Sequence, residues 1–313
     1  MILLLGASGY IGRAFASELR WRRQSFIPLT RAAFDYSDFD LLLDYVRKTS
    51  PTFIINAAGY PEPADGRDSE AVHAEMLRAN TLLPQTVAKV CLMTNTPWGH
   101  VSSGNIFAGA KVLRNGQHQV ERDLGQPSLQ RLFTLQPELF RGFNELDEPN
   151  CSFLRPPCTF YSGTKALAEA ALSGINNCYI WRPGPVFDCE DSPRNFLSHL
   201  LCHNGDAGGI TSVSHRVDFV CACLDLWQRA APFGVYHVTN PGALMFGELT
   251  DRIRRSRRRP VVCAQPHPPV SYCILDSSKL SSRGVRMRPA WVAVNETLRA
   301  EPCRPLAVVS REP

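Results

Sequence analysis

The sequence contains no long apolar run, and no stretch approaches the roughly 20 residues that a membrane-spanning helix requires. Met1–Leu5 is apolar but too short to serve as the apolar region of a signal peptide, so no export signal is expected. The 11 cysteines show neither C-x-x-C pairs nor metal-ligand spacing, which disfavours a zinc site and favours reduced thiols. We therefore expect a cytoplasmic protein that uses no membrane and no metal.

An excess of charge of one sign is also lacking, because 34 basic residues face 29 acidic ones and the formal net charge is +5. Hydrophobic residues at 44% and charged residues at 20% of 313 are typical of a folded chain with a sizeable core. One basic run stands before Pro260, at Arg252, Arg254, Arg255, Arg257, Arg258 and Arg259. It has no interleaved aromatic residues and the chain has no nucleic-acid-binding motif, so a solvated helix end is favoured over a nucleic-acid partner.

Short apolar runs alternate with helical patterns over the first 187 residues. This alternation predicts parallel strands joined by right-handed helical crossovers. The expected strands are 1–5, 26–29, 53–55, 98–101 and 178–181, and the expected helices are 13–19, 39–48, 71–91 and 161–172. A polar insertion over 109–157 interrupts the pattern, and the chain after Asp188 is richer in loops and prolines.

The expected fold is therefore α/β, with a Rossmann-like doubly wound parallel sheet over 1–187 and a smaller C-terminal substrate-binding lobe over 188–300. The segment 301–313 is interpreted as a tail. Ligands of such sheets bind beyond the carboxyl ends of the strands. The residues that fall at these ends are Asn56, Ala57, Ser102, Ser103 and Pro183.

A glycine-rich loop follows the first apolar run, with the sequence Gly6-Ala7-Ser8-Gly9-Tyr10-Ile11-Gly12. Its spacing is G-x-x-G-x-x-G rather than G-x-G-x-x-G, but it lies between an expected strand and an expected helix, as a dinucleotide-binding turn does. Gly6 permits a tight turn, Gly9 lets the backbone approach a pyrophosphate, and Gly12 lets helix and strand pack closely. The alternative is an ordinary glycine turn of an α/β protein.

Tyr161 and Lys165 are four residues apart in an expected helix, so their side chains lie on one face, one turn apart. A lysine ammonium beside a phenol favours the phenolate and lowers the phenol's pKa, which suits proton transfer near neutral pH. Ser103 would be a turn residue if it stood alone. Together with Tyr161 and Lys165 it instead indicates a hydroxyl that stabilises charge on a reacting oxygen.

These motifs resemble the extended short-chain dehydrogenase/reductase superfamily. The resemblance rests on Gly6–Gly12, Asn56–Gly59, Asn80, Ser103 and the pair Tyr161-x-x-x-Lys165. Within its sugar-nucleotide branch, which includes NAD-dependent epimerases and dehydratases, the chain is similar to dTDP-4-dehydrorhamnose reductase and to the plant-type nucleotide-rhamnose epimerase/reductase domain. The segments that carry this narrower similarity are 143–150, 160–166, 193–196 and 234–242, with a weaker one at 275–280.

The resemblance implies an NAD(P)H-dependent reductase that delivers a hydride to C4 of a nucleotide-4-keto-6-deoxyhexose. Tyr161 would donate the proton, Lys165 would lower the pKa of Tyr161 and hydrogen-bond the nicotinamide ribose, and Ser103 would hydrogen-bond the same oxygen. A non-catalytic dinucleotide-binding regulatory subunit and a nucleotide-sugar epimerase remain alternatives. Dimers through sheet-flanking helices are common in the superfamily, so a homodimer also stays open.

The residues expected to bind the cofactor are Gly6, Ser8, Gly9, Tyr10, Ile11, Gly12, Arg31, Asp35, Tyr36, Asn56, Ala57, Ala58, Gly59, Asn80, Ser102, Tyr161, Lys165, Pro183 and Val186. Asn80 has a role inside its helix as an equal alternative. Thr30 and Arg31 follow the second expected strand without an acidic residue, and an arginine there suits a 2′-phosphate. NADP(H) is therefore favoured, with NAD(H) as the alternative.

The residues expected to bind the nucleotide-sugar substrate are Ser103, Gly104, Asn105, Arg194, Asn195 and Arg216. Arg216 in particular suits bidentate binding of a diphosphate, although a surface salt bridge is an equal reading for either arginine. Asn105 stands where the epimerase/reductases of this branch carry an acid/base cysteine. An amide has no proton that titrates near neutrality, so we expect reduction without epimerisation. Dehydration is disfavoured too, since no Asp-Glu pair follows Ser103.

Overall fold

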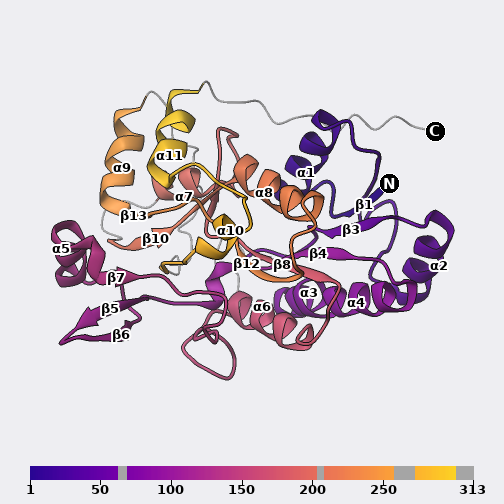
Figure 1. Cartoon of the computed structure of the whole chain (residues 1–313), viewed down its shortest axis with the longest axis horizontal. Coiled ribbons are helices and arrows are strands. Elements are labelled where there is room, and N and C mark those ends of the chain that lie inside the picture. The colour runs from indigo at the N-terminus through magenta and orange to yellow at the C-terminus, as the bar shows by residue number, and fades with distance from the viewer. Residues whose placement is uncertain (63–68, 203–207, 257–271, 301–313) are drawn as a thin grey trace.

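The computed structural model describes residues 1–62, 69–202, 208–256 and 272–300. The expected tail 301–313 and the end of the arginine run, 257–259, lie outside the described residues. Six parallel strands form the main sheet in the order β12-β8-β4-β3-β1-β2 (Figure 1). Their bounds are Ile2–Leu5 for β1, Phe26–Leu29 for β2, Phe53–Asn56 for β3, Trp98–Val101 for β4, Cys178–Arg182 for β8 and Gly234–His237 for β12.

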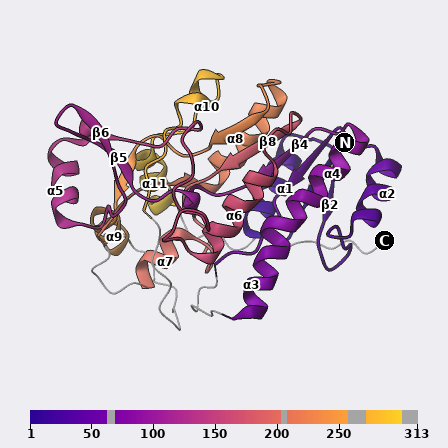
Figure 2. The ribbon, with the colours of Figure 1, turned by 90° about the horizontal axis from the view of Figure 1, so that it is seen from below.

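Helices cover both faces of this sheet, as the doubly wound pattern predicts. Within β1, Ile2 and Leu4 pack into the core formed with α1 (Tyr10–Trp21) and α8 (Arg216–Gln228). Leu3 and Leu5 point to the opposite face, which α2 (Phe39–Thr49) and α4 (Leu83–Thr94) cover (Figure 2). Because successive side chains of a strand alternate between faces, a continuously apolar strand requires this double burial. The predicted Rossmann-like α/β fold is confirmed.

The strand order reverses direction between β1 and β3. The chain passes from β1 to β2 on one side and then to β3 on the other side of β1. Such a switch point opens a crevice at the carboxyl ends of the two strands, where open α/β sheets bind ligands. The glycine loop follows β1, and Asn56 closes β3, so both motifs meet at this crevice.

The expected helix over 71–91 is a continuous helical stretch with an irregular centre. It consists of α3 (Glu70–Leu77), a π-helical turn over Arg78–Leu82, and α4. Asn80 lies in the π-helical turn and is fully buried. Single π turns within helices are frequently found at functional sites, so this turn is consistent with a special role for Asn80.

The insertion 109–157 has its own secondary structure. It contains a three-stranded sheet in the order β6-β5-β7, with the short helix α5 beside it (Figure 1). The bounds are Ala110–Arg114 for β5, Gln117–Glu121 for β6, Pro127–Leu135 for α5, Pro137–Leu139 for a 3-10 turn and Phe140–Arg141 for β7. Another 3-10 turn, Gly104–Ile106, follows β4, and α6 (Phe160–Ala171) follows the insertion.

A smaller lobe lies beyond the carboxyl edge of the main sheet and has a separate apolar core that includes Phe187, Leu197 and Phe246. Its elements are β9 (Val186–Phe187), α7 (Phe196–Cys202), β10 (Ile210–Ser212), β11 (Ser214–His215), β13 (Ala243–Met245), α9 (Phe246–Arg255), α10 (Ser278–Ser282) and α11 (Ala290–Arg299). Strand β10 pairs with β13, and β9 pairs with β11.

Two features differ from the expectations. The boundary expected after residue 187 does not separate the main sheet from the lobe. Strand β12, from the C-terminal half, pairs with β8 at the edge of the main sheet, and helix α8 packs on one face of that sheet. Cys189 is disulfide-bonded, whereas reduced thiols were expected throughout. Across the described ranges no helix is long and apolar enough to cross a bilayer, and no three His, Cys, Asp or Glu side chains are grouped to hold a metal ion.

Candidate active site

The glycine loop is shaped by close backbone contacts. Gly6 has φ +77, and a Cβ there would lie 2.6 Å from the Ala58 nitrogen. A Cβ on Gly12 would lie 2.0 Å from the Gly6 carbonyl oxygen, so neither position accepts a side chain. Gly9 has more room, is exposed, and is the N-cap of α1 without a side-chain cap. The first turn of α1 also carries no acidic residue, which leaves its backbone N–H groups suited to a phosphate.

The segment after β3 lies directly beside this loop. The buried Asn56 side chain accepts a hydrogen bond from the Ala58 nitrogen at 3.2 Å and contacts His100 Nδ1 at 3.3 Å. Ala57 and Ala58 are half-buried and Gly59 is exposed, so this backbone faces the crevice.

Asn80 holds the next part of the same segment. Its Nδ2 donates to the Tyr60 carbonyl at 2.8 Å, and its Oδ1 accepts from the Tyr60 nitrogen at 2.9 Å. Nδ2 also contacts Thr164 Oγ1 at 3.3 Å. These contacts use the hydrogen-bonding groups of the amide outside its own helix, so Asn80 positions the Tyr60 backbone.

The end of β2 supplies a charged cluster at the other side of the glycine loop. Arg31 is exposed and forms a loose ion pair with Glu75 at 3.4 Å, and Glu75 also pairs with Arg78 at 2.7 Å. Asp35 accepts hydrogen bonds from Ser37, which hold the pKa of its carboxyl below the usual value. Tyr36 is buried, which raises its pKa, and its phenol contacts the Gly6 backbone.

Ser103 and Tyr161 meet at the carboxyl end of β4. Ser103 extends from the strand end and Tyr161 from the first turn of α6, and the Ser103 hydroxyl lies close enough to the phenol to lower its pKa. Ser103 Oγ also accepts a hydrogen bond from the Asn105 nitrogen at 3.1 Å. Thr159 caps α6 by accepting from the Ser162 nitrogen at 3.1 Å, and this fixes the turn that carries Tyr161.

Lys165 lies one helical turn below Tyr161 and is 4% exposed. Its ammonium donates to the Val101 carbonyl at 3.1 Å. A Cβ built on Gly59 would lie 3.4 Å from Lys165 Nζ, so the ammonium faces the backbone after β3. Burial lowers the pKa of Lys165 to about 8, although Glu169 acts in the opposite direction.

The pKa of Tyr161 departs from the expected direction. Burial raises it above the usual value, Glu62 raises it further, and the nearby Ser103 hydroxyl and the charge of Arg194 lower it. Lys165 is not among the groups that shift this pKa, so the expected lowering through Lys165 is wrong, and desolvation of the phenol sets the direction. A phenol that stays protonated at neutral pH is suited to give up a proton rather than to accept one.

Two residues near Tyr161 were not expected from the sequence. Glu62 is half-buried, and burial raises the pKa of its carboxyl while the nearby Thr159 side chain lowers it. Tyr60 lies close enough to Arg194 to influence the pKa of its guanidinium. Neither residue belongs to a recognisable spacing, so only the folded chain brings them to the site.

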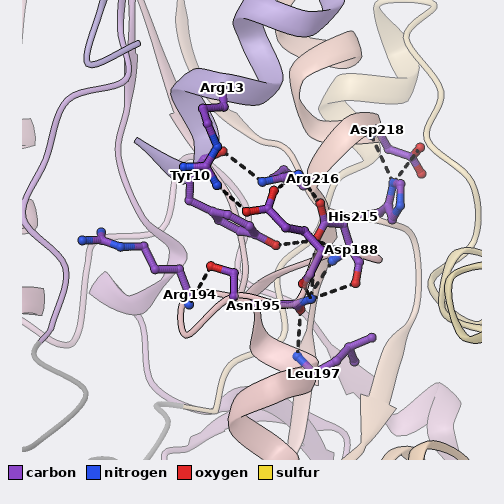
Figure 3. A network of polar contacts seen from close by, with 11 residues as sticks. Tyr10, Arg13, Asp188, Arg194, Asn195, Leu197, His215, Arg216 and Asp218 are labelled. Carbon is purple, nitrogen blue, oxygen red and sulfur yellow. Dashed lines mark hydrogen bonds and ion pairs between the residues drawn. The ribbon is translucent and has the colours of Figure 1, made fainter. Parts of the chain in front are cut away.

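The segment 188–195 runs past the same site. Arg194 is exposed, its side chain extends away from the neighbouring polar network (Figure 3), and it lies near Tyr161 and Tyr60. Asn195 is fully buried, and its amide donates to the Asp188 and Glu190 carbonyls at 2.8 and 2.7 Å. Arg194 thus remains available to a substrate, whereas the Asn195 side chain closes its own loop.

Arg216 does not face open space. It is 8% exposed, and its guanidinium lies 4.1 Å above the Tyr10 ring and pairs with Asp188 at 2.5 Å and Glu190 at 2.7 Å (Figure 3). The Tyr10 hydroxyl donates to Asp188 at 2.8 Å, and Arg13 pairs with Glu190. These contacts argue against the expected roles, because they direct Arg216 away from a diphosphate and the Tyr10 side chain away from a cofactor.

The remaining expected residues also include some that face the site and some that are buried away from it. Ser102 donates a hydrogen bond to Glu169 and is buried beneath the site rather than facing it. Gly104 donates to the Pro183 carbonyl at 2.7 Å, which joins the ends of β4 and β8. Asn105 and Val186 are half-buried at this edge, and Ile11 packs against the core. Ser8 is exposed beside Gly9.

Comparison with known proteins gives sequence relatives in one family of sugar-nucleotide enzymes. Residues 1–131 match the family model described as the RmlD substrate binding domain. A dTDP-4-dehydrorhamnose reductase from Mycolicibacterium smegmatis is 23% identical over 312 residues, which cover 93% of this chain and 82% of the relative. The trifunctional UDP-glucose 4,6-dehydratase/UDP-4-keto-6-deoxy-D-glucose 3,5-epimerase/UDP-4-keto-L-rhamnose-reductase of Arabidopsis thaliana is 25% identical over 218 residues, which are 69% of this chain but only 28% of that protein.

Solved structures share the fold over almost the whole chain. The L780 UDP-rhamnose synthase from Acanthamoeba polyphaga mimivirus superposes with a TM-score of 0.74 at 16% identity, covering 95% of this chain and 98% of the other. A dTDP-4-dehydrorhamnose reductase from Bacillus anthracis in complex with NADP gives 0.69 at 17% identity, covering 95% and 97%. MoeE5, solved with UDP-glucuronic acid and NAD, gives 0.67 at 17% identity over 95% and 96% of the two chains.

Neighbours of this fold thus bind NADP or NAD, and one of them a nucleotide sugar. The chain is similar to dTDP-4-dehydrorhamnose reductases in sequence and to extended short-chain dehydrogenase/reductase structures in fold, and the resemblance that its motifs predicted is confirmed.

Proposed function

We propose that this chain is an NAD(P)H-dependent reductase of a nucleotide-4-keto-6-deoxyhexose, with Tyr161 as the proton donor to the C4 oxygen. The observation that carries the proposal is that Ser103, at the end of β4, and Tyr161, in the first turn of α6, lie close together at the edge of the sheet where the glycine loop also lies. Two hydroxyl groups that converge on one point suit a carbonyl oxygen that gains negative charge.

The protonation of the site supports reduction. Burial keeps Tyr161 in its neutral form by raising the phenol's pKa, so a proton is available when charge develops on the substrate oxygen. Ser103 donates a second hydrogen bond to that oxygen once the phenol turns toward it. Lys165 carries a positive charge close to the same oxygen for as long as the pH stays below its pKa of about 8.

The residues of the crevice fit a dinucleotide. The uncapped N-terminus of α1 and the exposed Gly9 suit its pyrophosphate, and the backbone at Ala57–Gly59 lines the approach to Lys165. When bound, the reduced nicotinamide supplies the hydride for C4. Arg31, without an acidic residue beside it in the sequence, suits a 2′-phosphate, so we propose a preference for NADPH over NADH.

Arg194 is the proposed contact for the nucleotide sugar, since it is exposed and its charge reaches Tyr161. Arg216 is not part of this proposal because Asp188 and Glu190 engage its guanidinium. Epimerisation is not proposed either, since Asn105 offers no titratable group beside Ser103.

The test is to incubate the purified chain with NADPH and a panel of dTDP- and UDP-linked 4-keto-6-deoxyhexoses. We expect oxidation of NADPH, measured at 340 nm, with stoichiometric formation of the 4-hydroxy sugar, measured by mass spectrometry. NADPH binding without turnover on any member of the panel would instead favour the regulatory subunit. Tyr161→Phe is the matched control, because it removes only the proton-donating hydroxyl.

A further inference from the structure

A buried ion pair lies directly beneath Ser103, Tyr161 and Lys165. Arg182, at the end of β8, is 4% exposed, and Glu169, in α6, is 7% exposed. The Arg182 Nε donates to both Glu169 carboxylate oxygens at 3.1 and 3.0 Å, and Nη2 donates to Oε2 at 2.5 Å. The pair is therefore fully formed and geometrically fixed, as desolvated pairs must be to persist.

The pair contacts both elements that carry the proposed catalytic groups. Ser102, the neighbour of Ser103, donates its hydroxyl to Glu169. Glu169 follows Lys165 by four residues, so the two side chains share one face of α6. The Lys165 ammonium nevertheless donates to the Val101 carbonyl at 3.1 Å and forms no direct salt bridge with Glu169. Glu169 therefore acts on Lys165 through its charge.

Apart from Glu169, the ionisable groups next to Lys165 are neutral near pH 7, and the charged Lys279 and Asp147 are coupled to Arg182 and His237 instead. His100, on β4, is fully buried, and burial together with Lys165 holds its pKa well below the usual value. His237, on β12, contacts Arg182 Nη1 at 3.1 Å, and burial lowers its pKa to about 3. Tyr161 and Cys178 both have pKa values raised by burial. Among the described residues, Glu169 is thus the charge that acts on Lys165, and Arg182 is the partner of Glu169.

We propose that Glu169 and Arg182 are positioning residues that set the protonation of Lys165, with Glu169 favouring the ammonium and Arg182 limiting that effect. The pair has zero net charge, but Glu169 shares one face of α6 with Lys165 whereas Arg182 ends β8, and Glu169 is the member whose charge acts on Lys165. The catalytic importance of Lys165 rests on the proposed function. The electrostatic coupling of Glu169 and Arg182 to Lys165 does not depend on that function.

The coupling is measured by NMR on protein labelled with ¹³C at the lysine Cε. The chain has only five lysines, Lys48, Lys89, Lys111, Lys165 and Lys279, so five signals are expected, and Lys165→Arg assigns the one of interest. The Lys165 signal should titrate near pH 8 in the unmodified chain. The variants are Glu169→Gln, Arg182→Met and their combination.

The expected midpoints rise in the order Glu169→Gln, the double variant, the unmodified chain, and Arg182→Met. Glu169→Gln should lower the midpoint by about one pH unit or more, because removal of a nearby opposite charge has that effect. Glu121→Gln makes the same chemical change in the exposed pair with Arg114 and should leave Lys165 unmoved. The proposal is overturned if both single variants shift the Lys165 midpoint in the same direction, or if neither variant shifts it.

Loss of one partner leaves a buried charge uncompensated, so a single variant can fail to fold. The double variant removes both charges and then carries the test alone: a midpoint below that of the unmodified chain supports the proposal, and an equal or higher midpoint contradicts it. Because the titration needs neither cofactor nor substrate, an inactive protein with the expected order would contradict the proposed function and leave the coupling intact. An active protein in which the Lys165 midpoint is the same in all variants would support the proposed function and contradict the coupling.

Discussion

Arg216→Met tests whether the network in Figure 3 stabilises the fold. The substitution keeps an unbranched side chain over the Tyr10 ring but removes the guanidinium from Asp188 and Glu190, which are 2% and 4% exposed. Removal of one partner from a buried ion pair costs about 3–5 kcal/mol, because the remaining charge is desolvated and unpaired. For a chain of this length such a loss corresponds to a decrease in Tm of about 5–8 °C.

The pH dependence of the loss identifies its cause. In the variant, burial without the guanidinium should raise the pKa of the two carboxyl groups above that of the unfolded chain. A group with a raised pKa in the folded state stabilises that state at low pH and loses this contribution as the pH rises. The deficit relative to the unmodified chain should therefore be smallest near about pH 4 and should grow toward pH 7.

The measurement is thermal unfolding by calorimetry or circular dichroism at several pH values between 4 and 7.5. Arg114→Met is the matched control, because Arg114 pairs with Glu121 on the surface of β5 and β6 and should contribute less than about 1 kcal/mol. An equal effect of the two substitutions, or a deficit in Arg216→Met that is independent of pH, would refute the reasoning.

Three further predictions concern the proposed reaction. Tyr161→Phe should lower kcat about 10²–10⁴-fold with little change in the Kd for NADPH, measured by fluorescence titration, and full activity would exclude Tyr161 as the proton donor. Arg31→Ala should raise KM for NADPH while leaving KM for NADH nearly unchanged, and an equal effect on both in steady-state kinetics would remove Arg31 from the 2′-phosphate site. Incubation with a 4-keto-6-deoxy substrate in deuterated water should give no rapid incorporation at C3 or C5, because Asn105 offers no base; mass spectrometry that detects such incorporation would restore the epimerase alternative.

Local patterns in the sequence were sufficient for the main sheet. An apolar run such as Met1–Leu5 predicts a strand buried on both faces, and the structure places Leu3 and Leu4 in the two separate cores. The expected meeting of Ser103 with Tyr161 also occurs, because strand ends in a parallel sheet share one edge.

Long-range charge contacts were not accessible in the same way. Arg216 lies 28 residues from Asp188 in the chain and 206 residues from Tyr10, and no spacing rule indicates that the three side chains stack and pair. The direction of the Tyr161 pKa also depended on burial of the phenol, which a four-residue spacing does not reveal. Glu169 was the missed residue with a usable signal, since it follows Lys165 by the same spacing that links Lys165 to Tyr161.

The return of β12 to the edge of the main sheet has a consequence for how the chain folds. A nascent or truncated chain that ends near residue 187 has β8 as an unpaired edge strand and lacks α8 over one face of the sheet. Exposed edges of this kind pair readily with other chains, and contacts between distant segments form slowly. The first 187 residues are therefore not expected to fold as an independent fragment, and the main sheet becomes complete only after about residue 237 has left the ribosome.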